Sequence, residues 1–493
     1  MGLIPLTIPP GVYKNGTDYM AKGRWFDANL IRWHDDVLQP IGGWRIKSTT
    51  ASAQPIRGLW AWKDNSNNRY IGAGSHNKLY AYTSAGTQYD ITPAGFTSGR
   101  ADALVSIGYG ALTYGDYPYG DPRPDNGTVL EATTWTLDNW GETLVGCSTS
   151  DGKIYTWALN TSNVATLIAN APTGCIGLYV SEERFLFALG AGGNPRKVQW
   201  SDKEDNTTWT PSATNEAGDL ELQTTGVIRC AVRVRGQTLI LTNLDAHVAS
   251  YLGPPFVYGI ERVGTSCGVI SNKAVAVIDQ GAVWMADGKF FMYQGGAPTE
   301  IKCDVADHVF SNYNVVQRSK IVAVVNSQFS EIWWFYPSTS STENDKYVAW
   351  NYSNNTWHIG TLGRTAGVDK GTYDQPLYFG SSDKKLYEHE IGTSYDSATP
   401  FVESGAIEIG AGDRVMQVTK LIPDEKTAGD VQVIFKSRLY PNGEETSHGT
   451  FSMASPTSVR FSGRQVSMKI QQNVAGDWRV GTMRIDAKPG GMR

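Results

Sequence analysis

The 493-residue chain is 41% hydrophobic and 11% aromatic, enough apolar material for two or three domains or for one large repeat architecture. Its 53 glycines, 22 prolines, 24 tyrosines and 16 tryptophans favour strands joined by tight turns over helices. Lys and Arg number 43 against 48 Asp and Glu, giving a net charge of −5 with no basic stripe, so we expect no long-lived DNA binding, although brief contact with passing DNA stays open.

Residues 1–50 predict an extended N-terminal arm, too short to be a domain. The opening "MGLIPLTIPPGVYKNG" has no basic region and Pro5 breaks its apolar run, so it does not predict a signal peptide. No stretch of the chain reaches membrane-spanning length, and we expect synthesis in a cytoplasm. The alternating "RWFDANLIRWHDDVLQPIGGW" predicts a strand added to another element, either closing a ring or reaching a neighbouring molecule.

A short phrase, which we call the hairpin phrase, recurs four times along the chain. Each copy follows an apolar run, contains turn residues such as Asp151-Gly152 that tolerate the positive φ of a tight turn, and precedes an alternating aromatic strand. Each therefore predicts a β-hairpin. The copies are "GSHNKLYAY" (74–82), "STSDGKIYTW" (148–157), "ADGKFFMY" (286–293) and "SSDKKLYEH" (381–389).

The spacing of the hairpin phrase predicts a repeat architecture. Its lysines, Lys78, Lys153, Lys289 and Lys385, are 75, 136 and 96 residues apart. With an insertion of roughly 30 residues in the first gap, these gaps hold one, three and two units of roughly 45 residues, the length of a propeller blade.

Residues 51–393 therefore predict a β-propeller of about six or seven blades. We expect the blades that lack the hairpin phrase at 175–222, 226–265 and 318–362. A large β-sandwich with fortuitous internal similarity is the alternative.

The insertion lies at 94–132 and includes the Tyr-, Gly-, Asp- and Pro-rich stretch 107–127. A loop of this length is typically functional or disordered, and tyrosines supply rigid contacts. The insertion is therefore a candidate contact surface, and the equally supported alternative is a mobile loop that has no partner in the isolated protein.

Residues 394–493 change to longer alternating strands and predict an appended C-terminal β-sandwich, with Val431, Val433 and Phe435 on one face.

Motifs that could carry chemistry are few and weak. Gly264-Thr-Ser266-Cys-Gly268 fits a nucleophile elbow, but the following "VISNKAVAVI" predicts a strand where the elbow needs a helix. The stretch Ser201–Trp209 is faintly similar to the Asp-box of sialidase-like propellers, which is a structural turn. "GAGGNP" (190–195) lacks the third glycine of a dinucleotide site, and neither Gly152-Lys153 nor Gly288-Lys289 completes a phosphate loop.

Metal ligation and acid–base catalysis are also not indicated. His34 beside Asp35 and Asp36, and the run Glu388-His389-Glu390, are more simply interpreted as solvated surface than as ligands. The cysteines form no CxxC pair, and we expect each to lie reduced in a strand: Cys147, Cys175, Cys230, Cys267 and Cys303. We thus name no catalytic, cofactor-binding or metal-binding residue, although a propeller pocket can draw on several blades without a local motif.

Several longer phrases resemble a family of tail proteins of short-tailed bacteriophages. They are "YKNGTDYMAKGRWFDANLIRW…LQPIGGW", "EIWWFYPSTSSTENDKYVAWNYSNNTW", "LYEHEIG" and "FSGRQVSMKI…DWRVGTMRIDAKPGG". The "NLIRW…LQPIGG" part is also distantly similar to the opening of packaged-DNA-stabilisation proteins of P22-like phages. The resemblance spans nearly the whole chain and implies a virion protein, the tail nozzle or tail hub, present as a ring of six copies below the adaptor. It carries over no catalytic residue.

The sequence therefore predicts a non-enzymatic structural protein of the virion tail, made in the host cytoplasm. Expected partners are copies of itself, the adaptor on the portal side, a tail fibre or spike, and double-stranded DNA in transit during ejection. The alternative is a glycan-binding or glycan-cleaving propeller that acts as a receptor-binding tail component. A bacterial sensor or scaffold propeller is a third possibility, which the absence of a predicted signal peptide disfavours.

Overall fold

A computed structural model describes residues 3–105, 129–408, 412 and 414–491. Within these ranges the chain is almost entirely β-structure, with one short helix, α1 (Ala306–Ser311), and a few 3-10 turns. The predicted fold class, a β-propeller with a C-terminal β-sandwich, is confirmed. No described helix has the length and apolarity needed to cross a bilayer.

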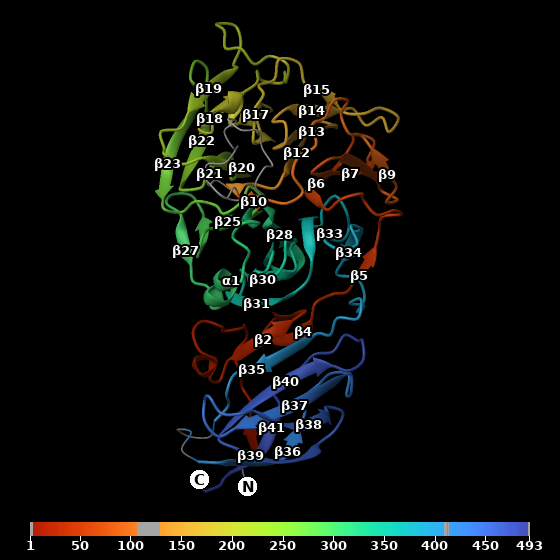
Figure 1. Ribbon diagram of the computed structural model, residues 1–493, viewed down its shortest axis with the longest axis vertical. Helices are drawn as coiled ribbons and strands as arrows, with labels where there is room; N and C mark the ends of the chain where they lie inside the picture. The colour runs from red at the N-terminus through yellow and green to blue at the C-terminus, as the bar shows by residue number, and fades with distance from the viewer. Residues whose placement is uncertain (1–2, 106–128, 409–411, 413, 492–493) are drawn as a thin grey trace, which may run out of the picture.

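Seven four-stranded antiparallel sheets follow one another through the described part of the propeller. The first strand of each sheet contacts the first strand of the next, and that of the last contacts that of the first, so the seven sheets close into a ring. Figure 1 looks onto the face of this ring. The propeller has seven blades, at the upper end of the predicted range.

The first three blades are regular meanders. The first blade consists of β6 (Ile56–Lys63), β7 (Arg69–Ser75), β8 (Leu79–Thr83) and β9 (Gln88–Asp90). The second consists of β12 (Trp135–Trp140), β13 (Thr143–Ser148), β14 (Ile154–Trp157) and β15 (Thr166–Leu167). The third consists of β16 (Gly177–Val180), β17 (Leu186–Leu189), β18 (Lys197–Trp200) and β19 (Gly218–Glu221).

The next three blades follow the same order of strands. The fourth consists of β20 (Ile228–Val234), β21 (Gln237–Thr242), β22 (Asp245–Gly253) and β23 (Val257–Thr265). The fifth consists of β24 (Val275–Ile278), β25 (Gly281–Met285), β26 (Phe290–Tyr293) and β27 (Thr299–Ile301). The sixth consists of β28 (Val322–Asn326), β29 (Glu331–Tyr336), β30 (Lys346–Asn351) and β31 (Thr356–Thr361).

The seventh blade is completed by the N-terminal arm. It contains β32 (Arg364–Val368), β33 (Leu377–Gly380) and β34 (Leu386–His389), and its outer strand is β5 (Trp44–Ile46). The pairs His389–Trp44 and Tyr387–Ile46 set the register. The ring is thus closed by two segments more than 300 residues apart in the sequence, which resists opening because the strand cannot leave without breaking the blade.

The hairpin phrase occupies the same place in each blade that carries it. Its turn joins the second and third strands of the first, second, fifth and seventh blades. In the fifth blade the backbone N–H of Ala286 donates to the carbonyl of Lys289 at 2.8 Å, and in the seventh Gly380 donates to Lys385 at 2.9 Å. Gly152 and Gly288 adopt φ of +62° and +78°, as the Asp-Gly turns require.

Two sheets form the sandwich, and both take a strand from the arm. One sheet runs β1 (Leu3–Pro5), β41 (Arg484–Pro489), β36 (Met416–Ile422) and β39 (Thr457–Gly463). The other runs β2 (Trp25–Asn29), β35 (Phe401–Ser404), β40 (Gln465–Gln472), β37 (Val431–Arg438) and β38 (Thr446–Ser452). The alternation noted in the sequence places Val431, Val433 and Phe435 inside, each at most 1% exposed.

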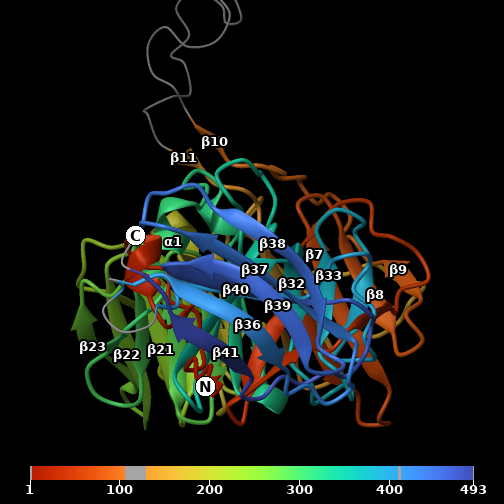
Figure 2. The same ribbon diagram turned by 90° about the horizontal axis from the view of Figure 1, so that it is seen from below.

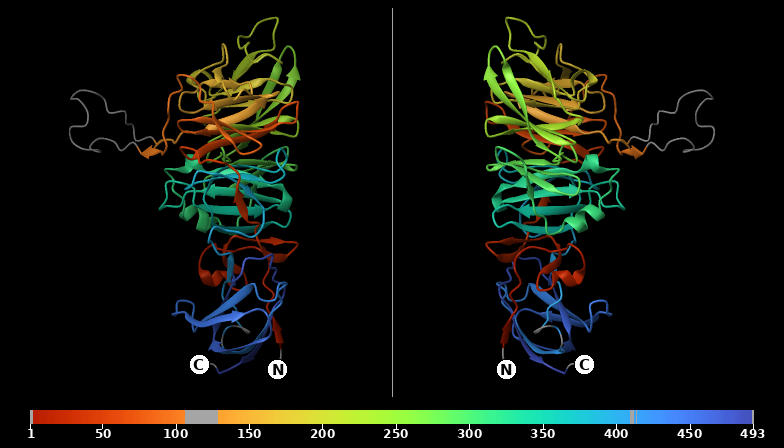
Figure 3. Two further views of the ribbon diagram at one scale, coloured as in Figure 1. Left: turned by 90° about the vertical axis from the view of Figure 1, so that its right-hand side faces the viewer. Right: turned by 90° about the vertical axis from the view of Figure 1, so that its left-hand side faces the viewer.

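The arm also lies between the two domains as a hairpin of β3 (Ile31–His34) and β4 (Val37–Pro40). Figure 1 shows the arm, in red, between the propeller above and the sandwich below. Figure 2, seen from below, shows the strands of the sandwich in front of the propeller, with the two chain ends on the sandwich side. In Figure 3 the sandwich continues the plane of the propeller disc, so it is attached to the rim and not to a face.

One hydrophobic cluster joins the fourth, fifth and sixth blades of the propeller to the arm and the sandwich, and the other blades have clusters of their own. The buried members of the joining cluster include Trp334 and Trp357 of the sixth blade, Trp33 of the arm, and Val433 and Met468 of the sandwich. Domains that share a large apolar interface move as one body, since separating them exposes that area to water. We therefore expect the propeller and the sandwich to form one stiff unit.

A two-stranded ribbon leaves one face of the propeller (Figures 2 and 3). Its strands, β10 (Leu104–Val105) and β11 (Val129–Leu130), pair in antiparallel fashion. They form the stem of the predicted insertion, and the Tyr- and Gly-rich stretch 107–127 itself lies outside the described residues.

Candidate functional site

The arm is joined to the propeller by a buried ion-pair network centred on Arg32 of β3. Its guanidinium donates from Nε and Nη2 to the carboxylate of Glu331 at 3.0 Å each, and from Nη1 and Nη2 to Glu390 at 2.8 and 2.6 Å. The side chains of Arg32 and Glu331 are 1% and 0% exposed. The ring of Phe329 covers the guanidinium at 3.7 Å.

Further donors satisfy the two carboxylates. Glu390 accepts from the backbone N–H of Gly42 at 2.9 Å and from the amide of Asn326 at 2.8 Å, while Glu331 accepts from the indole of Trp333 at 2.9 Å. Burial alone would lower the pKa of Arg32, but the two carboxylates outweigh it and raise the pKa above its ordinary value. The arginine is therefore permanently charged, and the network fixes the position of the arm.

The interpretation of Glu388-His389-Glu390 as solvated surface is wrong. Glu388 pairs with Arg45 at 2.8 Å and with Lys47 at 2.7 Å, both from the arm. His389 is 5% exposed, stacks on Trp44 and accepts a hydrogen bond from Arg364 Nε at 2.9 Å. The run is buried because β34 has the arm strand β5 as its neighbour, a pairing that no local pattern reveals.

His34, Asp35 and Asp36 do lie at the surface, in the turn between β3 and β4. The side chains of His34 and Asp35 are 43% and 90% exposed, with 3.6 Å between them. Asp35 and Asp36 adopt φ of +49° and +62°, as a tight hairpin turn requires.

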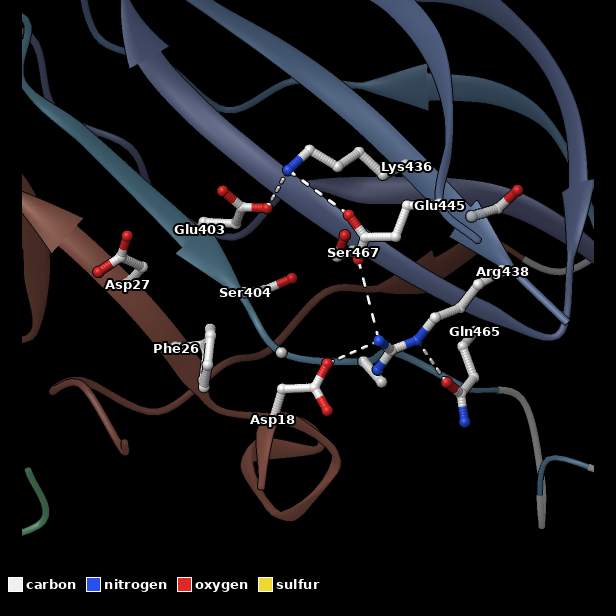
Figure 4. A pocket seen from close by; sticks show the side chains of 13 residues that line it. Asp18, Phe26, Asp27, Glu403, Ser404, Lys436, Arg438, Glu445, Gln465 and Ser467 are labelled. Carbon is white, nitrogen blue, oxygen red and sulfur yellow. Dashed lines mark hydrogen bonds and ion pairs between the residues drawn. The ribbon is translucent and has the colours of Figure 1, made fainter. Parts of the chain in front are cut away.

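The arm is joined to the sandwich at a polar pocket of about 190 Å³ (Figure 4). The 3-10 turn η1 (Asp18–Ala21) and β2 face strands β35, β37 and β40 across it. Lys436 pairs with Glu403 at 2.6 Å, and Arg438 pairs with Asp18 of η1 at 2.6 Å. Arg438 also donates to Gln465, which in turn donates to Glu408 at 2.8 Å.

These contacts hold η1 on the sandwich. The cations of the pocket are both engaged by carboxylates, and Asp18 and Glu445 are more than 40% exposed. Ion pairs that are this accessible contribute about 1 kcal/mol or less each. The pocket therefore serves orientation of the arm.

The propeller encloses a central cavity of about 370 Å³. The inner strand of every blade lines it: β6, β12, β16, β20, β24, β28 and β32. Most of the lining is apolar. Asp138 accepts hydrogen bonds from the backbone of Val180 and Asn139 and pairs with Arg233 at 3.2 Å, yet burial still raises its pKa.

Lys273, just before β24, also lines the central cavity. Its ammonium makes no hydrogen bond or ion pair with the described residues, and burial lowers the pKa of Lys273 to about 8. The thiol of Cys230 lies nearby, and burial raises its pKa to about 12. The five cysteines are free and buried, but only Cys147 and Cys230 lie within strands; the expectation that each lies in a strand is wrong for Cys175, Cys267 and Cys303, which lie in connecting segments.

A second cavity, of about 490 Å³, lies at the mouth of the first. It is formed by residues 97–100 and 131–134 beside the insertion stem and by residues 227–229 of the fourth blade. Asn272 lines both cavities and donates to Thr134 Oγ1 at 2.6 Å.

The insertion stem is anchored on this face of the propeller. Gln317 bonds both the N–H and the carbonyl of Ala103 at 2.9 Å, and the buried ammonium of Lys320 contacts Asp102 at 2.5 Å. Phe96 stacks on Trp135 of the second blade, with ring centroids 5.3 Å apart. The stem is thus held by the second and sixth blades together.

The weak motifs lie in structural turns. Ser266 adopts φ of +56° after β23, and the chain continues to β24 with no helix between; no hydrogen bond joins Ser266 to the buried His247. In Ser201–Trp209, which belongs to the segment that connects β18 to β19, Asp205 accepts hydrogen bonds from Thr207 and Thr208, and Trp209 is buried. The glycines of 190–195 form the 3-10 turn η2 (Ala191–Gly193).

No group of three or more His, Cys, Asp or Glu side chains among the described residues could hold a metal ion.

Comparison with known proteins gives likeness of fold alone. No protein-family profile matches the chain, and no curated protein matches it. Among solved structures, a virginiamycin B lyase from Staphylococcus aureus is 9% identical, with 70% of this chain and 98% of that chain covered and a TM-score of 0.44. The Cps50 (Swd1) β-propeller domain of Myceliophteria thermophila is 8% identical, covering 70% and 99%, with a TM-score of 0.40. The first of these is an enzyme by name, and the second is described only as a propeller domain.

Proposed function

We propose that the chain is a structural protein of a virion tail, and that copies of it form a ring, six in number, that serves as the nozzle or hub of a short-tailed phage. The proposal rests on the resemblance of its longer phrases and on one structural observation. That observation is the path of the arm, which alternates between sandwich and propeller.

The alternation is visible in successive contacts. β1 pairs with β41 in the sandwich, then the N–H of Val12 donates to the carbonyl of Trp357 in the propeller at 2.7 Å. β2 returns to the sandwich, Arg32 is bound by the propeller, and β5 completes the seventh blade. An arm that pairs alternately with the two domains resists shear between them, because sliding one domain past the other would break several of these contacts together.

The interior of the propeller is too small to be the path of the DNA. Its central cavity, about 370 Å³ in volume, is walled by side chains of all seven inner strands. The major groove of B-DNA alone is about 12 Å wide, so a duplex does not fit. The conduit of the proposed nozzle therefore lies between copies of the chain, which is a reason for proposing a ring.

An acidic, weakly charged chain also suits a conduit. Every phosphate neutralised by Lys or Arg adds to the affinity for DNA and slows its transit. The formal net charge here is −5. We assign contacts with the adaptor and with a fibre or spike to the insertion stem and the exposed hairpin tips, and we assign no catalytic step.

Sedimentation of the purified chain tests the proposal. We expect a closed ring with the mass of six copies of the 53.9 kDa chain, formed by the chain alone or on addition of the adaptor ring. A monomer or trimer that binds sugars saturably would contradict it and favour the receptor-binding alternative.

A further inference from the structure

We propose that the central cavity of the propeller binds a small organic carboxylate, with Lys273 as the residue that receives the carboxylate group. The site goes beyond the structural role proposed above and does not depend on it, since it lies wholly within one chain.

The charges of the cavity leave one cation without a counter-ion. Arg233 is paired with Asp138 at 3.2 Å, and Arg57 is paired with Glu343. Lys273 has neither partner among the described residues, although Asp138 and Cys230 are its nearest titratable neighbours. Lys273 is half-buried, so its ammonium is partly removed from water, and an anion placed beside it offsets that cost.

Two further polar atoms at the same end of the cavity lack partners. Arg57 is 5% exposed, and its Nη1 makes no hydrogen bond. The side-chain oxygen of Asn272 is also buried and unbonded. Arg57 is the second residue of β6 and Asn272 precedes β24, so both lie near the starts of inner strands, and Asn272 also lines the mouth cavity.

Both atoms are closed off from the cavity by their neighbours, so they do not contact an occupant. The ammonium of Lys273, which lines the cavity and has no hydrogen bond or ion pair with the described residues, matches a carboxylate oxygen.

The rest of the cavity suits an apolar body. Its apolar lining residues include Leu137, Leu178, Val232, Val275, Val277 and Val368. A volume of about 370 Å³ lies within the range of small-molecule sites, about 300–1,000 Å³. The mouth cavity, which shares Asn272, provides the route of entry.

The proton affinity of the lysine adds a pH signature. Burial lowers the pKa of Lys273 to about 8, so the ammonium is charged at neutral pH and neutral above pH 9. The other charged groups on the cavity are Asp138, Arg233 and Arg57, and the neighbouring thiol of Cys230 stays protonated throughout that range because burial raises its pKa to about 12. Carboxylate binding should therefore weaken as the pH rises through 8.

Titration of the full-length chain with benzoate and with its neutral analogue benzamide tests the site, with binding followed by calorimetry or ligand-observed NMR. We expect benzoate to bind saturably at pH 7, at least tenfold more tightly than benzamide, and to lose this advantage above pH 9. Absence of saturable benzoate binding, or equal binding of the two probes at pH 7, would overturn the proposal.

Variants separate the site from the surface. Lys273→Met should abolish the preference for benzoate, whereas Lys289→Met, at an exposed lysine paired with Glu300, should leave it unchanged. Val275→Phe fills part of the cavity without changing its charge, and we expect it to weaken both probes. Retention of the benzoate preference in Lys273→Met, or unchanged binding of both probes in Val275→Phe, would contradict the assignment.

Discussion

Arg32 and Glu331, 299 residues apart in the sequence, form a two-pronged ion pair inside the protein with both hydrogen bonds at 3.0 Å. The first belongs to the N-terminal arm and the second begins β29 of the sixth blade. Neither side chain is more than 1% exposed. The pair therefore secures the arm at the joint between the propeller and the sandwich, where the hydrophobic cluster that joins the two domains also passes.

Replacement of Arg32 by methionine should destabilise the protein strongly. The change leaves the carboxylates of Glu331 and Glu390 buried beside each other without a cation. Breaking a buried pair by removing one partner costs about 3–5 kcal/mol. The free energy of unfolding from urea titration measures the effect.

Arg45→Met is the matched control for that variant. Arg45 also comes from the arm and pairs with Glu388, but its side chain is 66% exposed, so the loss should stay below about 1 kcal/mol. Equal losses in the two variants would show that the buried network does not hold the joint.

Heating should unfold the propeller and the sandwich in one transition, because they share one hydrophobic cluster and the arm that pairs with both. Trp44→Ala, in the strand that closes the seventh blade, should lower the midpoint of this whole transition, since removing a buried tryptophan costs about 3–5 kcal/mol. Differential scanning calorimetry measures both. Two separate transitions, with only one shifted in the variant, would contradict the single stiff unit.

Lys273→Met should change the stability of the protein at basic pH. Burial lowers the pKa of Lys273 to about 8 from 10.5, so the folded state binds fewer protons than the unfolded state between those values. The free energy of unfolding of the natural chain therefore rises by up to about 3 kcal/mol as the pH rises from 8 to 10.5. The variant should lack this rise in denaturant titrations, and an identical slope in both proteins would rule out the effect.

Acid should destabilise the protein through its buried histidines. Burial lowers the pKa of His358 to about 3 from 6.5, and burial with the nearby Arg364 lowers the pKa of His389 well below its ordinary value. The folded state then binds fewer protons, and stability is lost as the pH falls below 6.5, by up to about 1.4 kcal/mol per pH unit for each histidine.

The variant His358→Phe isolates one of these histidines. Its ring lies edge-on against Trp333 at 5.3 Å and its Nε2 makes no hydrogen bond, so phenylalanine should keep the packing. Between pH 6.5 and 4 the variant should lose less stability than the natural chain in urea titrations. A variant that loses as much would show that His358 is not the titrating group.

Phe256→Asp should impair ring assembly without unfolding the chain. Phe256 is 76% exposed at the tip between β22 and β23, beside Leu252 at 61%. We expect this apolar tip to lie in the interface between copies, and a surface substitution changes stability by about 0.5 kcal/mol or less. Light scattering and thermal melting measure the two effects, and rings that form as readily as those of the natural chain would remove this tip from the interface.

The blades could be predicted from sequence because their signals are local. An Asp-Gly turn flanked by alternating aromatics, as at Asp151-Gly152, encodes its own hairpin, and the spacing of such hairpins predicted about six or seven blades, of which the structure has seven. The joint between the domains could not be predicted, because its parts meet only in the fold. Nothing near Arg32 in the sequence identifies Glu331 as its partner, and nothing near Glu388 shows that Arg45 covers it.

The same reason explains why the central cavity was missed. Lys273, Asp138 and Arg57 come from different blades, and the sequence around each of them contains no motif that indicates a shared site. Only closure of the ring brings their side chains to one cavity.

Electron microscopy of infectious particles that carry a tagged copy of this chain is the most direct test of the proposed nozzle. We expect tags at the tail, arranged in a ring of six around a channel that lies between the subunits and is wide enough for duplex DNA. Particles without the tag, or a tag at single peripheral sites with no ring around the tail axis, would contradict it.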